Sequence, residues 1–197
     1  MVVKNRLITS AGCESEANTA FPLRRSLFLI VGRTPSLIKN SVTRKLTTQQ
    51  SGELNSNASG FVGQYAHGNE PSHHVAYLYN YAGQPWKTQQ YVAHILTNLY
   101  NNSFSGYAGN DDCGEMSAWY IFSAMGFYPV NPANGIYVIG CPLLEETCIQ
   151  LPNGKQFTVK APKRNEKDIY IQSARLNGKN YNKTYLSHEE ILKGGTL

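Results

Sequence analysis

Apolar residues recur every three to four positions between residues 71 and 126, and this period predicts three helices. Each helix has a proline or aspartate near its start and a glycine or asparagine at its end, which suit those positions. The helices begin at Pro71, at Pro85 and after Asp111-Asp112, and they end at Gly83, Asn101-Asn102 and Gly126. Their inward faces are formed by Val75, Leu78, Tyr79 and Ala82, by Val92, Ile95, Leu96 and Leu99, and by Met116, Trp119 and Tyr120.

After Pro132 the period changes to two, which predicts strands at residues 136–139, 147–151, 156–159 and 169–171. Asn153-Gly154 and Asn177-Gly178 are strong hairpin signals. Helices followed by strands indicate an α+β fold rather than alternating βαβ units. The chain divides into a segment without a coherent pattern (1–51), a helical portion with two polar loops (52–131) and a β-rich portion (132–197), and residues 51–59 resemble a polar linker.

Composition excludes two classes of protein. Residues 27–31 form the longest aliphatic and aromatic run among the 197 residues, far short of the roughly 20 that a membrane span needs. The net charge of +5 is unevenly distributed: residues 60–150 carry one basic against six acidic residues, yet hold sixteen of the 22 aromatic residues. A nucleic-acid surface interleaves aromatic side chains with Lys and Arg, so this pattern argues against a nucleic-acid partner.

Two loops, each directly before a predicted helix, hold most of the polar groups that could perform chemistry: residues 67–74 and residues 109–115. In the second, Asn110, Asp111 and Asp112 are suited to activating water or to binding a hard cation. The alternative is a helix cap with an exposed neighbour. Aromatic residues near both loops could dock a sugar ring or could be ordinary core; they are Tyr65, Trp86, Tyr107 and Trp119.

Metal binding has two candidates of different chemistry. Zinc would use His67, His73 and His74, with Cys113 as a further ligand, but no His-Glu-x-x-His spacing is present. Calcium is the better candidate because it prefers oxygen donors. The oxygen donors of the two loops are Asn69, Glu70, Asp111 and Asp112.

Several long strings resemble glycoside hydrolase family 92, the calcium-dependent α-mannosidases. They are residues 63–74, which include the run His67-Gly68-Asn69-Glu70-Pro71, residues 77–88, residues 109–120, residues 123–130 and residues 170–179. The resemblance extends from about residue 52 to residue 197. Because these strings are long and unusual in composition, the resemblance is specific.

The resemblance implies part of an (α/α)6 helical barrel followed by antiparallel β-sandwich strands. It implies exo-acting hydrolysis of mannose-containing glycans, with inversion and assisted by calcium. By the same resemblance, the catalytic base is Asp112, with Asp111 or Asn110 assisting, and the calcium ligands are Asn69 and Glu70. The residues that the resemblance implies for substrate binding are His67, Glu70, Trp86 and Asn110.

The chain also departs from the family. Family members are several times longer, and their general-acid glutamate lies upstream of the Gly-Asn-Glu-Pro loop, where residues 1–50 show no resemblance. We therefore expect a C-terminal fragment whose partner is the missing N-terminal part of the same enzyme. No signal segment is recognisable, whereas the family resemblance implies a periplasmic or secreted protein. The alternative function is a non-catalytic carbohydrate-binding or scaffold remnant.

Overall fold

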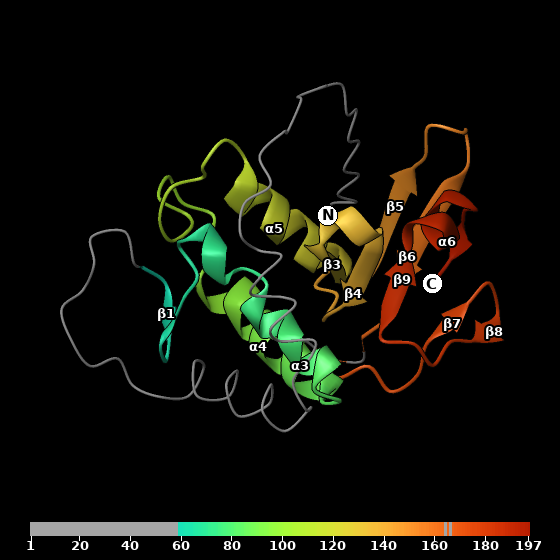
Figure 1. Ribbon diagram of the computed structural model, residues 1–197, viewed down its shortest axis with the longest axis horizontal. Helices are drawn as coiled ribbons and strands as arrows, with labels where there is room; N and C mark the ends of the chain where they lie inside the picture. Colours follow the sequence, from blue (N-terminus) through green and yellow to red (C-terminus); the bar gives the residue numbers. More distant parts are fainter. Residues whose placement is uncertain (1–58, 164, 166) are drawn as a thin grey trace.

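The computed structural model describes residues 59–163, 165 and 167–197, with helices α3, α4 and α5 on one side and most strands, together with α6, on the other (Figure 1). The predicted segment 1–51 and nearly all of the polar linker lie outside the described residues. The helical elements are η1 (Glu70–Ser72), η2 (Val75–Tyr77), α3 (Leu78–Tyr81), α4 (Pro85–Asn98), α5 (Glu115–Met125), η3 (Pro132–Asn134) and α6 (His188–Leu192). The strands are β1 (Phe61–Val62), β2 (Tyr65–Ala66), β3 (Phe127–Asn131), β4 (Ile136–Ile139), β5 (Glu146–Gln150), β6 (Gln156–Lys160), β7 (Arg175–Leu176), β8 (Lys179–Asn180), β9 (Tyr185–Ser187) and β10 (Gly195–Thr196).

The first predicted helix is divided into η1, η2 and α3, so the expectation of one continuous helix is wrong. The division occurs at His73 and His74. The carbonyl oxygen of His73 accepts a hydrogen bond from Trp119 Nε1 at 3.1 Å, and the amide of Tyr77 donates to His74 instead. The apolar face is nevertheless buried as expected, because Val75, Leu78, Tyr79 and Ala82 all pack into the core.

The other two helices agree with the sequence. Helix α4 starts at Pro85, and helix α5 ends at Gly126, whose φ of 106° lies in the left-handed region that favours glycine. The start of α5 differs from the expectation, because its N-cap is Gly114 rather than one of the two aspartates. The polypeptide needs a left-handed turn over residues 112–114 before the helix can begin.

The strands form small sheets. β5 and β6 pair antiparallel across the Asn153-Gly154 turn, and β7 pairs with β8 across Asn177-Gly178, which confirms both hairpins. β4 lies between β3 and β9, and β10 adds to β6 in parallel. The strand expected at residues 169–171 is absent. That segment is instead held by side chains, since Gln89 Oε1 accepts from the Ile171 amide and Cys141 Sγ donates to the Ile169 carbonyl.

Two buried clusters form the core. The larger one joins β2, α3, α4 and α5 and centres on Tyr65, Tyr77 and Trp119, each at most 1% exposed. The smaller one lies between the sheets and α6, around Phe157 and Leu186. The α+β class with antiparallel strands is thereby confirmed, whereas the assignment of the helices to part of an (α/α)6 barrel stays a prediction. Among the described residues, no helix is long and apolar enough to cross a membrane.

We predict that Gly126→Ala destabilises the chain more than Gly83→Ala. Both glycines have positive φ, but a Cβ at Gly126 would lie 2.6 Å from Pro142 Cγ, whereas nothing lies within 4 Å of a Cβ at Gly83. The left-handed backbone alone costs roughly 1–2 kcal/mol for alanine, and the clash adds about 1–3 kcal/mol. Urea unfolding of both variants measures the difference; equal losses would contradict this account of the α5 terminus.

Candidate active site

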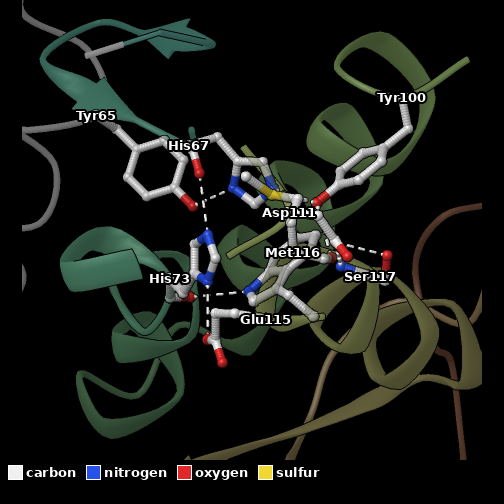
Figure 2. A network of polar contacts seen from close by, with 9 residues as sticks. Tyr65, His67, His73, Tyr100, Asp111, Glu115, Met116 and Ser117 are labelled. Atoms are coloured by element: carbon white, nitrogen blue, oxygen red, sulfur yellow. Dashed lines mark hydrogen bonds and ion pairs between the residues drawn. The ribbon is translucent and has the colours of Figure 1, made fainter. Parts of the chain in front are cut away.

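A fully buried histidine links three segments of the chain (Figure 2). His67 follows β2, and its Nδ1 lies 2.7 Å from the hydroxyl of Tyr65. Its Nε2 lies 2.6 Å from the hydroxyl of Tyr100, which follows α4. The ring also packs edge-on against Trp119 of α5, with 4.3 Å between the ring centroids. His67 therefore joins the first polar loop to both α4 and α5.

The hydrogen bonds around His67 define one consistent arrangement of protons. The Tyr100 hydroxyl donates to Met116, whose Sδ is 3.0 Å away, so it accepts from His67 Nε2–H. His67 Nδ1 then accepts from the Tyr65 hydroxyl. Burial lowers the pKa of His67 to about 3, with a smaller contribution from the charge of His73. His67 is thus a neutral imidazole with both nitrogens occupied, and its ring offers no free group to a substrate in this structure.

A second buried histidine connects the first loop to the start of α5. His73, which is 2% exposed, places Nε2 3.0 Å from the His67 carbonyl oxygen and Nδ1 3.3 Å from Glu115 Oε1. Its own carbonyl oxygen accepts from Trp119 Nε1. The hydrogen bond from His73 lowers the pKa of Glu115. This contact fixes the first turn of α5 to the end of the 67–74 loop.

Asp111 stabilises the start of α5. Its Oδ1 accepts from the backbone amide of Ser117 at 2.9 Å and from the Ser117 hydroxyl at 2.6 Å. Its carbonyl oxygen accepts from the amides of Gly114 and Met116. Asp111 therefore caps the helix from three residues before the N-cap, and the same bonds fix the direction of its carboxylate. The catalytic and the capping interpretation of this residue are compatible.

Asp112 lies beside Asp111 in a strained turn. Its φ is 47° and that of Cys113 is 60°, a backbone conformation that costs of order 1–3 kcal/mol for a residue other than glycine. The exposed carboxyl group of Asp112 shares a hydrogen bond with the carboxyl group of Glu70. This bond raises the pKa of Asp112 and lowers that of Glu70. The fold thus brings one acidic residue from each polar loop into direct contact.

Three other predicted site residues lie apart from Glu70 and Asp112 or make fewer contacts: Asn69, Asn110 and Trp86. Asn69 is half-buried and does not cap η1 with its side chain, and Asn110 is exposed. Trp86 is 49% exposed at the start of α4, about 20 Å of helix away from the end that leads to Tyr100. The structure therefore gathers Glu70, Asp111 and Asp112 but does not bring Trp86 to them.

Among the described residues, no three His, Cys, Asp or Glu side chains form a group that could hold a metal ion. The zinc interpretation is therefore not supported, since Tyr65 and Tyr100 occupy both nitrogens of His67. Calcium is compatible with the oxygen donors of Glu70 and Asp112, although these supply only part of the six to eight ligands that it takes. A groove of about 1180 Å³ lies elsewhere in the fold, and none of the predicted site residues lines it.

Sequence reasoning missed the supporting residues His73, Glu115 and Tyr100 as members of one network. His73 and Glu115 each lay within a polar loop that the sequence singled out, so an acid–histidine pair between the loops was a signal available in principle. Tyr100 had no such signal. It follows a regular helix, and only the packing of α4 against α3 and α5 directs its hydroxyl to His67.

Comparison with known proteins identifies the class as glycoside hydrolases. The glycosyl hydrolase family 92 catalytic domain matches residues 37–197. The chain therefore belongs to glycosyl hydrolase family 92, which confirms the resemblance recognised in the sequence. The match begins upstream of residue 52, where that resemblance starts.

Three relatives give the extent of the similarity. A family GH92 α-mannosidase from Bacteroides thetaiotaomicron, solved alone and with mannoimidazole, is 40% identical over 82% of this chain, with TM-scores of 0.76 and 0.77. A family GH92 inverting mannosidase from the same organism shares 40% identity, with a TM-score of 0.70. An uncharacterized secreted glycosidase of Arthroderma benhamiae is 39% identical over 133 residues, or 66% of this chain. The chain spans 17–23% of the length of these relatives.

We predict that protonation of His67 couples stability to pH. Its folded pKa of about 3 lies below the ordinary value of 6.5, so between these values the unfolded chain binds the proton more tightly. The free energy of unfolding therefore falls as the pH decreases from about 6.5, by up to about 1.4 kcal/mol per unit from this residue. Urea unfolding between pH 7 and pH 5 measures the slope.

The variant His67→Gln should be less stable at pH 7 but have a flatter pH dependence in this range. His94→Gln, at an exposed position of α4, is the matched control and should keep the wild-type slope. An unchanged slope in His67→Gln would show that another group causes the pH dependence.

Proposed function

We propose that this chain is the part of an exo-acting α-mannosidase that carries the catalytic base and the calcium-binding side of the active site. The observation that carries the proposal is the contact between Glu70 and Asp112, which joins the two polar loops within the region that matches the family. The similar enzyme solved with mannoimidazole supports mannose-containing glycans as the substrate class. A relative named as secreted supports a secreted or periplasmic location.

The proposed reaction inverts the anomeric carbon, as the name of one structural relative says of that enzyme. An inverting hydrolase needs a carboxylate that activates water and a carboxylic acid that protonates the leaving oxygen. We assign the base to Asp112, because it is exposed to solvent and its raised pKa makes it a stronger proton acceptor. Asp111 keeps the turn in place through Ser117, and exposed Asn110 is available to the sugar. The general acid is assigned to the upstream part of the enzyme.

We assign Asn69 and Glu70 as calcium ligands, in a position where the carboxyl group of Asp112 also lies within reach. Bound calcium would hold sugar hydroxyls and favour ring distortion toward the oxocarbenium-like transition state. The missing ligands would come from water, from the sugar and from the upstream part. In this arrangement Asp112 accepts the proton of the attacking water. The hydrogen bonds of buried His67 and His73 keep Glu70 opposite Asp112.

Calcium titration calorimetry on the 197-residue chain tests the metal assignment. We expect binding in the micromolar range that Asp112→Ala weakens at least tenfold, because the variant removes one of two contacting carboxylates. Glu189→Ala, which removes an exposed carboxylate from the first turn of α6, is the matched control and should bind calcium as the wild type does. Circular dichroism shows whether each sample is folded. A folded wild-type chain without calcium binding would contradict the assignment.

Turnover tests the placement of the general acid. We expect the chain by itself to hydrolyse an aryl α-mannoside at no measurable rate, because the residue that protonates the leaving group is assigned to the upstream part. Release of the aryl alcohol, followed by absorbance, is the measurement. Robust turnover that Asp112→Asn abolishes would place the acid within this chain.

The exposed ring of Trp86 favours the second candidate, a non-catalytic carbohydrate-binding module. In that case mannose binding would be lost in Trp86→Ala and retained in Asp112→Ala. The proposed function predicts the opposite dependence.

A further inference from the structure

The five residues that carry Asn69 and Glu70 form a turn, residues 68–72, that is fixed at both ends. At its start, the His67 carbonyl oxygen accepts from His73 Nε2 at 3.0 Å, and the Gly68 amide donates to Ser59 at 3.1 Å. At its end, the carbonyl oxygen of His73 accepts from Trp119 Nε1. The His73 side chain therefore links the end of the turn to its start, while the His73 backbone attaches the turn to α5.

Both nitrogens of the His73 ring face oxygen atoms. A carbonyl oxygen only accepts, so Nε2 must carry hydrogen to bond with His67. Nδ1 faces the carboxylate of Glu115, and this second contact is a hydrogen bond only when Nδ1 also carries hydrogen. The ring therefore lies almost fully buried between two oxygen atoms, with Nδ1 3.3 Å from a carboxyl group that is 43% exposed. A buried polar ring depends on its partners, since losing one of them leaves a buried donor or acceptor unsatisfied.

Glu115 also interacts electrostatically with Glu70 and Asp112, the acidic pair of the site. The charge of Glu115 opposes ionisation of Glu70, and the charge of Asp112 opposes ionisation of Glu115, although hydrogen bonds leave the pKa of Glu70 and of Glu115 lowered overall. Asp111 adds to the same effect at Asp112. The contact with His73 acts in the opposite direction, since it lowers the pKa of Glu115.

We infer that His73, paired with Glu115, is a positioning residue that sets the 68–72 turn so that Glu70 faces Asp112. It acts through the turn, because its ring is enclosed and cannot touch a sugar. This inference rests on the proposed function for its purpose. Its structural content, that the His73–Glu115 pair orders the turn, can be tested separately.

Two substitutions separate the two bonds of the ring. His73→Gln places an amide nitrogen near the position of Nε2 and can keep the bond to the His67 carbonyl, while it loses the pairing with Glu115. His73→Asn places a nitrogen near Nδ1 and does the reverse. Glu115→Gln keeps size and an acceptor but removes the charge. His94→Gln, on the exposed face of α4, is the control.

The first readout is amide hydrogen exchange of the turn, measured by NMR on the 197-residue chain. The amides of Ser72 and His73 donate to the carbonyls of Asn69 and Glu70, so their protection reports the order of the turn. We expect protection factors at these two positions to fall at least tenfold in both His73 variants and less in Glu115→Gln. Amides in the middle of α4 should keep wild-type protection in every variant.

The second readout is calcium affinity, with calcium chloride as the only added ligand. We expect it to weaken about tenfold in His73→Gln and to be unchanged in His94→Gln. If the folded wild type binds no calcium, the metal part of the proposed function fails, while the exchange experiment still decides the role of His73. Wild-type protection of the turn in Glu115→Gln and in either folded His73 variant would overturn the inference. If both His73 variants fail to fold, Glu115→Gln alone decides it.

Discussion

The enclosed imidazole of His67 is the point on which the geometry of the site depends. One nitrogen is bonded to Tyr65 in β2 and the other to Tyr100 beyond α4, while the ring packs on Trp119 in α5. Leaving a buried polar group without its hydrogen-bond partners costs about 1–3 kcal/mol of stability. The three segments that contact His67 are therefore held together, and the loss of one contact would loosen all of them. The two polar loops begin and end next to this contact. Their relative position therefore follows from the core and does not require contacts at the surface.

Around this rigid centre the chain accepts unfavourable local features. Asp112 and Cys113 adopt left-handed backbone conformations, and the carboxyl groups of Glu70 and Asp112 are held in contact. Strain and like charge of this kind persist only where the surroundings determine the conformation, and they are characteristic of functional sites. Buried His73 adds to this arrangement, since its contact with partly exposed Glu115 lowers the pKa of that carboxyl group.

Local patterns predicted the regular elements well. Helix α4, the end of α5 and the β5–β6 hairpin follow from apolar periodicity together with proline and glycine signals, all of which act within a few residues. The predictions failed where a distant partner replaced a local bond. Trp119 takes the His73 carbonyl and divides the first helix, and Gln89 together with Cys141 holds residues 169–171 outside any sheet.

The sequence by itself determined the α+β class, both hairpin turns and membership of glycosyl hydrolase family 92, because these are carried by short-range patterns and by long specific strings. It also singled out the loops that hold Glu70, Asp111 and Asp112. Only the tertiary structure decided that His67 is enclosed, that Trp86 lies at the end of α4 opposite the one that leads to Tyr100, and that His73 meets Glu115. The pairs 67–100 and 73–115 are separated by more than thirty residues, and contacts at such separations are set by how helices and strands pack, which no local pattern encodes.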